Sequence, residues 1–534
     1  MLESKQTKPT PHHHPSHFLS QQPNMGGRKD EISTTSGLQV PLIKSLHPSK
    51  KPKKRNHFAF LCSIVASMSS ILVGYDIGVM SGAAIYIQQD FNISDVQVEI
   101  LVGIISLFSI IGAAVAGITS DWLGRRYTIV LSAALFFFGA VLKGFAPNYP
   151  FLMFGRFVAG VAVGSASLIA SVYTAEVAPT SSRGCLYTFP EVFVNVGILI
   201  GYVSNFAFSK FPTNLGWRFM LGLGIIPSML LSIVVILIMP ESPRWLVMQG
   251  RINEAKQVLI RTSDSIEESI QRLADIKTVV GIPTSCDEDV VQVPKRKTHG
   301  SGVWKELFLH PTPAVVHILI TAVGVNFFAE ATGMNVVVSY SPRIFEKAGI
   351  SSTDHKLLTT MGVGITKTVF VLIATGMFDR IGRRPLILTS IAGKTISLIV
   401  LGVGMTIIDK SKEENTWVVG LCVAMVLTDV SFYSIGMGPM CYVVSEIFPL
   451  KLRSQGVSVA MITNRIMDSI VGMTFLSLYT AITIGGTFFL YGAFGVVGFI
   501  FFYVVLPETR GIELEELEGL FGNFLWKFSN NNRP

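Results

Sequence analysis

Two ionisable side chains of opposite charge stand inside long apolar stretches of this 534-residue sequence. Asp76 lies between Gly74 and Gly78, and Arg156 lies in a second apolar stretch further along the chain. If these stretches cross a membrane, charged residues inside them are costly and are candidates for function. Burial favours the neutral carboxyl and a nearby guanidinium favours the carboxylate, so Asp76 could bind a proton in one environment and release it in the other. A static buried ion pair is the alternative interpretation.

The sequence contains twelve apolar stretches, and the elements that they form must position these two residues. Each has about 20 residues or more and is long enough to cross a hydrocarbon core of about 30 Å. Only 15% of the residues are charged, against about 25% in an average soluble protein, which argues against a soluble enzyme of several domains. We expect an all-α membrane protein with spans at 58–87, 97–119, 127–146, 150–176, 185–208, 217–239, 314–345, 356–378, 385–409, 416–446, 453–480 and 485–506.

The positive charge of the chain is concentrated near its N-terminus. Residues 1–56 contribute +7 of the formal net charge of +8 and show no apolar periodicity, so we expect a disordered basic tail. The rest of the chain is close to neutral, which excludes a basic groove for nucleic acid. The five cysteines are single and scattered, which indicates neither a disulfide framework nor a zinc site, and we expect no metal and no cofactor.

Lysine and arginine in short loops mark the cytosolic side of a membrane protein. The run Lys50–Arg55 and the pairs Arg125-Arg126 and Arg383-Arg384 fall on one side if every stretch spans, so both termini are expected in the cytosol. The N-glycosylation sequon that begins at Asn92 falls on the other side. The expected domains are a cytosolic tail (1–56), a six-helix bundle (57–239), a cytosolic helical linker (240–313), a second six-helix bundle (314–506) and a C-terminal cytosolic tail (507–534).

Three charged motifs occur twice, in the same order and at nearly the same separation. Two apolar stretches lie between successive motifs, so every motif returns to the same membrane face and the two halves are parallel repeats. The charged residues of the motifs are Asp121, Arg125, Arg126, Glu176, Arg183, Glu241 and Arg244 in the first half, and Asp379, Arg383, Arg384, Glu446, Arg453, Glu508 and Arg510 in the second.

These motifs place carboxylates and arginines at helix ends, where they can form charge-assisted hydrogen bonds with neighbouring helices. We expect the duplicated cluster to act as a cytosolic latch that joins the inner ends of the two bundles and breaks during transport. The alternative is that the arginines only anchor the orientation in the membrane.

The duplicated motifs resemble the sugar-porter branch of the major facilitator superfamily, over about residues 57–515. The run Gly74–Ala83, with the sequence GYDIGVMSGA, is similar to the plant polyol/monosaccharide proton symporters of that branch. The resemblance implies the major facilitator fold, with twelve transmembrane helices in two six-helix repeats. It also implies that Asp76 and Arg156 occupy the positions of the proton-coupling pair, with Asp76 as the proton-binding carboxylate and Arg156 as its modulator.

The resemblance also implies a substrate site between the bundles near the middle of the membrane. By motif position, its candidate residues are Glu191, Asn335, Tyr442 and Asn464, to which we add Glu330. Tyr340 and the Gly436-x-Gly438-Pro439 motif are candidate gating residues, because proline and glycine would break the tenth helix. Each polar residue taken alone could instead make a helix–helix hydrogen bond.

The chain departs from the sugar-porter pattern at the substrate positions. Ala329-Glu330 stands where the family usually has two glutamines, Glu191 replaces a glutamine, Tyr442 replaces a tryptophan, and Ser339-Tyr340 replaces two outer tyrosines. Carboxylates in place of amides favour ligands with more hydroxyl donors, which suits linear polyols or cyclitols better than pyranoses. Arg465 and Asp468 could pair with each other or reach Glu330 or Glu191.

These observations predict a proton-coupled symporter of polyols and monosaccharides that works by alternating access. A facilitative hexose or cyclitol carrier is the alternative, and a non-transporting sugar sensor is a remote one. The sequence contains no nucleophile–base or metal constellation, so we expect no enzymatic activity. The expected partners are a polyol or monosaccharide, protons and the lipid bilayer, with no nucleic acid. We expect a multi-pass monomer in the plasma membrane.

Overall fold

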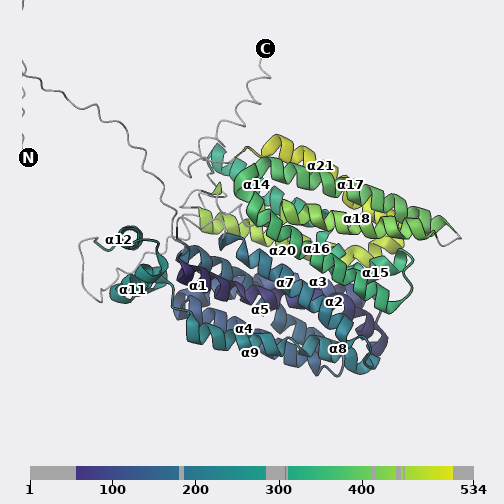
Figure 1. Cartoon of the computed structure of the whole chain (residues 1–534), viewed down its shortest axis with the longest axis horizontal. Helices are drawn as coiled ribbons and strands as arrows, with labels where there is room; N and C mark the ends of the chain where they lie inside the picture. Colours follow the sequence, from purple (N-terminus) through teal and green to yellow (C-terminus); the bar gives the residue numbers. More distant parts are fainter. Residues whose placement is uncertain are drawn as a thin grey trace, which may run out of the picture. The chain divides into compact units, whose positions relative to one another are not determined.

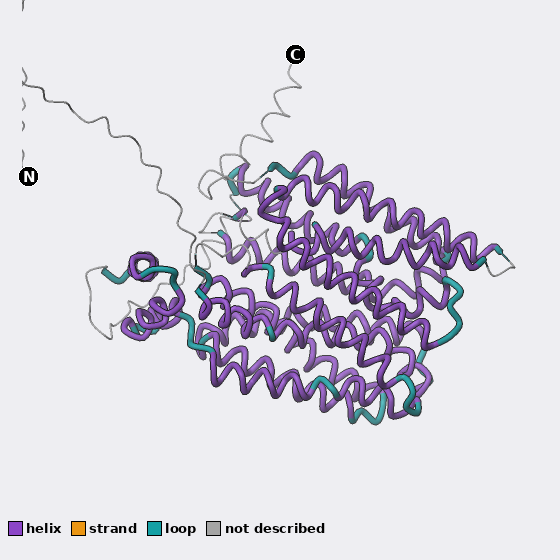
Figure 2. Tube along the Cα trace, in the orientation of Figure 1, coloured by secondary structure: helices purple, strands orange, loops and turns teal. Residues whose placement is uncertain are grey.

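The computed structural model describes residues 56–179, 186–283, 311–411, 415–440 and 452–508, together with residues 307, 309, 447 and 448. The side chains of residues 378–380, 453 and 454 are outside this description. The described part of the chain is helical and has no β-strand (Figure 2). Several predicted functional residues therefore lie outside the described residues or side chains: Arg183, Asp379, Tyr442, Glu446, Arg453 and Arg510.

The first half of the molecule is a bundle of antiparallel helices (Figure 1). It contains α1 (His57–Ser67), α2 (Ser69–Phe91), α3 (Asp95–Leu123), α4 (Arg125–Gly144), α5 (Tyr149–Val177), α7 (Phe189–Phe208), α8 (Thr213–Gly222) and α9 (Ile225–Ile238). The linker contains the short helices α10 (Pro243–Met248), α11 (Ile252–Thr262) and α12 (Ile266–Val280). The linker helices bury their own small apolar cluster, which includes Leu246, Leu259 and Leu273.

The second half repeats the arrangement of the first. It contains α14 (Pro313–Ala331), α15 (Met334–Lys347), α16 (Thr353–Ile381), α17 (Arg383–Lys410), α18 (Thr416–Ile435), α20 (Arg453–Ile482) and α21 (Ile484–Val505). We call the end of the bundles that carries the linker helices the linker end, and the opposite end, which includes residues 92–94 and 483, the far end.

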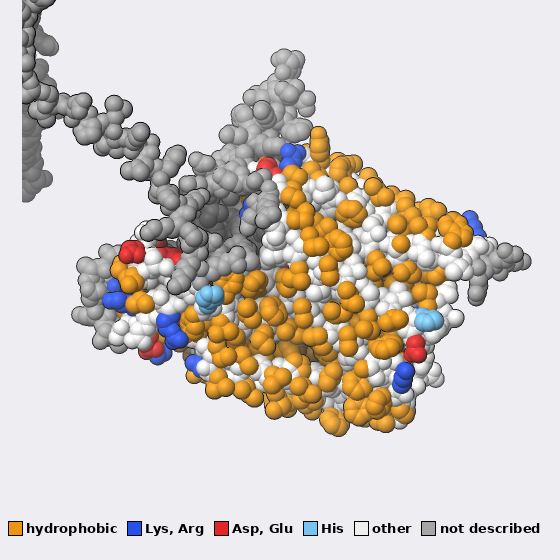
Figure 3. Space-filling view, viewed as in Figure 1, with side chains coloured by type: hydrophobic (Ala, Val, Ile, Leu, Met, Phe, Trp, Pro, Cys, Tyr) orange, Lys and Arg blue, Asp and Glu red, His pale blue; other side chains and the backbone are white. Residues whose placement is uncertain are grey.

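Twelve helical segments of the described chain are long and apolar enough to cross a membrane, which confirms the predicted fold class. Their outward faces carry exposed aliphatic and aromatic side chains, among them Ile118, Leu237 and Ile396. Hydrophobic side chains cover most of the face seen in Figure 3, while charged side chains gather toward its two ends. This pattern matches a protein surrounded by lipid along its middle.

Several predicted spans have an interruption that the sequence analysis did not expect. The helical hydrogen bonding pauses at Met68 between α1 and α2, and at Leu223 and Gly224 between α8 and α9, although the backbone at these residues keeps right-handed helical torsion angles. The seventh is divided into α14 and α15 at Gly333, whose φ of +77° lies in the left-handed region that glycine adopts without strain. Apolar content alone does not reveal such breaks, because both segments of a broken span remain apolar.

The predicted break in the tenth span is confirmed, and it lies at the first glycine of the motif. Helix α18 ends at Ile435, Gly436 has φ −124° and ψ −60°, and helical backbone resumes at Met437. A side chain at Gly436 would clash with α17, because a Cβ there would lie 2.6 Å from the Leu386 carbonyl oxygen. The close approach of two helices therefore requires glycine at the break.

Among the described helices, the two halves meet chiefly where α3 contacts α20, α7 contacts α16 and α2 contacts α15. Within the first half, α2 and α7 approach so closely that a Cβ at Gly74 would lie 1.9 Å from the Val194 carbonyl oxygen. The glycines that flank Asp76 therefore allow helix α2 to pack closely against α7.

Candidate functional site

Asp76 lies in a fully enclosed cluster of charges within the first half. Its Oδ2 accepts a hydrogen bond from Arg156 Nη1 at 2.6 Å, and its Oδ1 pairs with the ammonium of Lys143. The exposed fractions of Asp76, Lys143 and Arg156 are 3%, 3% and 1%. The structure therefore brings together the two residues that the sequence singled out and adds a second cation.

The rest of the Arg156 guanidinium is held by the backbone of α3. Nε donates to the Leu101 carbonyl at 3.0 Å and Nη2 donates to the Val102 carbonyl at 3.1 Å. Three helices, α2, α4 and α5, supply the three charges, and α3 supplies the carbonyls. This arrangement fixes the planar guanidinium, so that a single nitrogen is directed at Asp76.

Lys143 was missed by the sequence analysis. It stands at the end of the third apolar stretch, where a lysine ordinarily extends to the membrane surface and needs no partner. No signal in the sequence pairs it with Asp76, because Asp76 lies well inside the first span while Lys143 stands near the end of the third.

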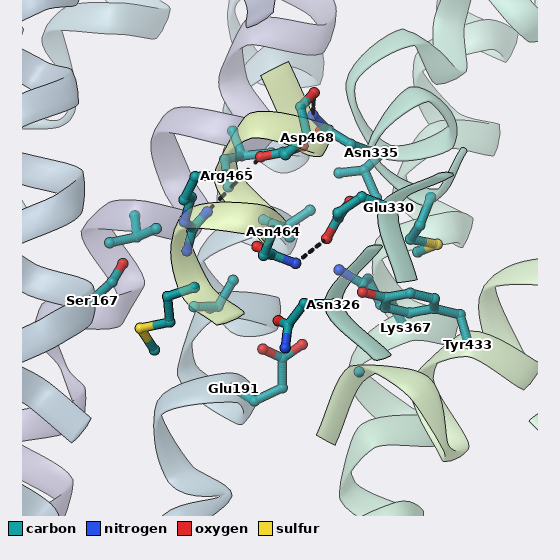
Figure 4. A pocket seen from close by; sticks show the side chains of 18 residues that line it. Ser167, Glu191, Asn326, Glu330, Asn335, Lys367, Tyr433, Asn464, Arg465 and Asp468 are labelled. Carbon is teal, nitrogen blue, oxygen red and sulfur yellow. Dashed lines mark hydrogen bonds and ion pairs between the residues drawn. The ribbon is translucent and has the colours of Figure 1, made fainter. Parts of the chain in front are cut away.

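A second group of polar side chains lines a cavity between the two halves (Figure 4). Side chains from α2, α5 and α7 of the first half face side chains from α14, α15, α16, α18 and α20 of the second half across this space. Its polar lining comprises Ser167, Glu191, Asn326, Glu330, Asn335, Lys367, Tyr433, Asn464, Arg465 and Asp468. Four predicted substrate residues, Glu191, Glu330, Asn335 and Asn464, therefore share one cavity, and the fifth, Tyr442, lies outside the described residues.

The carboxylates of the cavity are held by neutral donors or by a distant cation. Asn464 Nδ2 donates to Glu330 Oε1 at 3.0 Å, and Asn195 Nδ2 donates to Glu191 Oε1 at 3.0 Å. Arg465 Nη1 lies 3.9 Å from Asp468 Oδ2. The sequence left open whether Arg465 pairs with Asp468 or reaches Glu330 or Glu191, and in the structure it lies next to Asp468.

Asp468 also ties the cavity to the first half, because its Oδ2 accepts a hydrogen bond from Ser106 Oγ at 2.6 Å. Lys367 contributes a cation that the sequence analysis missed. Among the described residues it makes no hydrogen bond or ion pair, and its ammonium lies 5.9 Å from the centre of the Tyr433 ring. Hydroxyl groups of a ligand could therefore meet acceptors, amide donors and a cation in one space.

The predicted gating residues lie at two levels around this cavity. Tyr340, where α15 departs from helical geometry ahead of Pro342, donates its hydroxyl to the Gly472 carbonyl at 2.8 Å. Gly438 lines the cavity, and a Cβ there would lie 3.6 Å from Glu191 Oε1. Pro439 is buried next to it.

At the far end the two halves are closed against each other. The buried Glu99 of α3 accepts two hydrogen bonds from Ser477 of α20, from the backbone nitrogen at 2.7 Å and from Oγ at 2.6 Å. Ser469 Oγ donates to the Gly103 carbonyl at 3.1 Å, and Arg343 pairs with Asp95 at 3.2 Å. These contacts separate the cavity from the far end of the molecule.

Replacing Glu99 with glutamine is expected to weaken this closure, because the neutral amide lacks the negative charge that strengthens both hydrogen bonds from Ser477. A loss of about 1–2 kcal/mol would shift the open-to-closed ratio about five- to thirtyfold toward opening. Spin labels on the exposed far-end residues Phe145 and Trp417, one in each half, measure the shift as a longer distance population. The exposed carboxyl variant Asp409→Asn is the control, and an unchanged distance distribution in Glu99→Gln contradicts the prediction.

The duplicated charged motifs form compact clusters at the linker end. Arg125 makes a two-nitrogen contact with Glu176, both distances being 3.0 Å, and lies 3.3 Å from the exposed Asp121. Glu241 accepts hydrogen bonds from the backbone nitrogens of Arg125 and Arg126 at the start of α4. Burial raises the pKa of the Glu241 carboxyl above its ordinary value, while those backbone donors and the Arg125 charge oppose the rise.

The second half repeats this arrangement. Glu508 accepts hydrogen bonds from the backbone nitrogens of Arg383 and Arg384, each at 3.2 Å, and Arg384 Nη2 donates to the Tyr503 carbonyl at 2.7 Å. Arg244 is exposed and makes no ion pair with the described residues. The contacts of the described motif residues run between helix ends of one half, so a latch between the halves remains a prediction.

Comparison with known proteins places the chain in a family. A family model described as Sugar (and other) transporter matches residues 62–521. The chain belongs to this family. Polyol transporter 5 of Arabidopsis thaliana is 55% identical to it over 482 residues, which cover 90% of this chain and 89% of that protein.

Solved structures support the same family assignment. The proton:xylose symporter of the major facilitator superfamily, bound to 6-bromo-6-deoxy-D-glucose, is 26% identical with a TM-score of 0.72, covering 88% of this chain and 100% of that chain. The xylose transporter from E. coli in a partially occluded inward open conformation is 26% identical with a TM-score of 0.71, covering 86% and 100%. The chain is thus a multi-pass membrane transporter of the major facilitator fold, not an enzyme.

Proposed function

We propose that this chain carries polyols and monosaccharides across a membrane in symport with protons. The observation that carries the proposal is the cavity between the halves, which combines carboxylates, amides and a cation and is closed at the far end. Alternating acceptors and donors suit a ligand whose hydroxyls both donate and accept. The names of its relatives, a polyol transporter and a proton:xylose symporter, support the same substrate class and the same coupling.

In this proposal, Glu191, Glu330, Asn335, Asn464 and Tyr442 bind the substrate. The two halves rock about the cavity, so that it opens to one side and then to the other. Tyr340 and the Gly436–Pro439 break are the gates, and the charged motifs at the linker end are the latch that breaks and reforms.

Asp76 is the proton-binding group in this proposal. Its carboxylate is neutralised in the structure by Arg156 and Lys143, and a movement that draws it away from the guanidinium would favour the protonated form. Proton uptake and the closing of the halves would then be linked, because Arg156 is held by α3, which also contacts α20.

The orientation and location of the transporter are part of the proposal. The linker end faces the cytosol with both termini, because the short loops there carry the paired arginines. We propose that the protein is a monomer in the plasma membrane, and that its domains are divided at residues 56, 239, 313 and 506.

A facilitative carrier is the second candidate function. The specific observation that favours it is that Asp76 contacts two cations, both of which stabilise its ionised form.

Uptake of labelled sorbitol, mannitol, myo-inositol, xylose and glucose into transport-deficient cells, at an acidic and a neutral external pH, tests the proposal. Accumulation of a polyol above its outside concentration at acidic pH is the expected result. Equilibration without accumulation at both pH values would indicate the facilitative carrier instead.

A further inference from the structure

We propose that Lys143 is a positioning residue that sets the external acidity at which Asp76 takes up its proton, so that symport in this chain requires a lower pH than Asp76 and Arg156 alone would need. The inference rests on the proposed function and adds a third member to the coupling site.

The geometry gives Asp76 one cation for each carboxylate oxygen. Lys143 reaches Oδ1 from α4, and Arg156 reaches Oδ2 from α5. The Lys143 stem packs along α5, since a Cβ at Gly155 would lie 2.9 Å from Lys143 Cγ. The small residue at Gly155 therefore leaves the space through which the ammonium reaches Asp76.

Lys143 has no alternative counterion within the described part of the chain. Its described ion pair and its described hydrogen bond are both with Asp76, and its exposed fraction of 3% keeps it from water. Arg156 differs, because its other two nitrogens donate to α3 carbonyls. The Lys143 ammonium thus depends on the Asp76 charge more than the guanidinium does.

The other groups around Asp76 in the described part of the chain carry no charge. On its own helix, the Tyr75 hydroxyl donates to the Met220 carbonyl and meets Ser204. Helix α7 presents backbone at Gly197 and Gly201, and from α15 the Tyr340 hydroxyl lies near Arg156 and donates to the Gly472 carbonyl. The charge balance of the site is therefore set by Asp76, Lys143 and Arg156.

The charge balance decides how readily Asp76 accepts a proton. With Asp76 ionised, the cluster carries a net charge of +1, and protonation would leave two buried cations with no anion between them. A pair of Asp76 and Arg156 alone would pass from neutral to +1. Two enclosed cations repel each other, so protonation of Asp76 costs more free energy in the cluster with Lys143 than in a pair of Asp76 and Arg156 alone. Lys143 therefore opposes protonation of Asp76 until the outside is more acidic.

Replacing Lys143 with methionine, which keeps the length of the side chain, tests this inference. Polyol uptake is measured between about pH 4 and about pH 8, a range that begins at the ordinary pKa of a carboxyl group. The pH of half-maximal uptake is expected to rise by about one to three units, the usual effect of one adjacent charge. Lys143→Arg, which keeps the cation, should retain the wild-type profile, as should Lys410→Met at an exposed lysine.

The outcomes separate this inference from the proposed function. An acid-driven wild type whose profile is unchanged in Lys143→Met overturns the role of Lys143 and leaves symport in place. Absence of acid-driven accumulation in both proteins overturns symport itself. Acid-driven uptake that appears only in Lys143→Met supports the inference, because it shows that Lys143 holds coupling back.

A spectroscopic titration keeps the test decisive if Lys143→Met folds poorly. Lys143→Gln is then purified in lipid nanodiscs next to the wild type, and infrared spectra follow the carboxyl C=O band that disappears in Asp76→Asn. The band is expected to form at a higher pH in Lys143→Gln than in the wild type. Formation at the same pH in both proteins overturns the inference.

Discussion

Replacing Asp76 with asparagine is expected to abolish accumulation of polyols above their outside concentration, while exchange of labelled polyol across the membrane continues. Asparagine has the size of aspartate and still accepts a hydrogen bond from Arg156, but it cannot bind and release a proton. Uptake by cells at acidic external pH measures the loss, and counterflow from preloaded proteoliposomes measures the remaining exchange. Accumulation that persists in Asp76→Asn would show that the proton is carried elsewhere.

The control for this experiment is Asp409→Asn, which changes an exposed carboxyl at the far end of α17. A second comparison addresses folding. Asp76→Asn leaves Lys143 and Arg156 buried without an anion, and removing one partner of a buried pair costs about 3–5 kcal/mol. The double variant Asp76→Asn/Lys143→Met removes one of those cations and is expected to raise the protein level without restoring accumulation.

The spans of this transporter could be predicted from its sequence because each follows from a local signal. Apolar length predicts a membrane helix, and the charged motifs predict hydrogen bonds at helix ends, but they did not predict that Arg125 meets Glu176 and Glu241 of its own half. The break at Gly436 was also predictable, since glycine and proline weaken a helix wherever they stand.

Long-range pairings could not be predicted in the same way. Lys394 of α17 and Asp429 of α18 are both fully buried and pair at 2.8 Å, although neither was singled out by the sequence analysis. Each residue alone looks like an isolated charge in an apolar stretch, and only the rotation of the two helices brings the charges together. The same reason explains why the pairing of Lys143 with Asp76 was missed.

The substrate cavity was predicted in part. Glu330 and Asn464 were both proposed, but their direct hydrogen bond depends on how α14 and α20 are rotated. That bond has a consequence for selectivity. Asn464 occupies Oε1 of Glu330, and Oε2 is left to accept a hydrogen bond from a ligand hydroxyl in the cavity.

Replacing Glu330 with glutamine is therefore expected to impair polyol transport more than hexose transport. If the glutamine oxygen keeps the bond from Asn464, its amide nitrogen replaces Oε2, and the ligand hydroxyl exchanges a charge-assisted hydrogen bond for a neutral one. A hydrogen bond to a charged group contributes about 1.5–3 kcal/mol and a neutral one about 0.5–1.5 kcal/mol, so kcat/KM for sorbitol should fall about five- to tenfold. Competition between labelled sorbitol and glucose in the same cells measures the change in preference.

The control for this variant is Glu346→Gln, which changes an exposed glutamate on the neighbouring helix α15 and keeps the cavity intact. Asn464→Ala provides a second check, because it removes the donor to Glu330 and frees both carboxylate oxygens for ligand or water. If the Glu330 carboxylate recognises hydroxyl donors, Asn464→Ala retains the preference for sorbitol that Glu330→Gln loses. Equal losses for sorbitol and glucose in Glu330→Gln would instead assign Glu330 to holding α20 in place, since a structural contact affects every substrate alike.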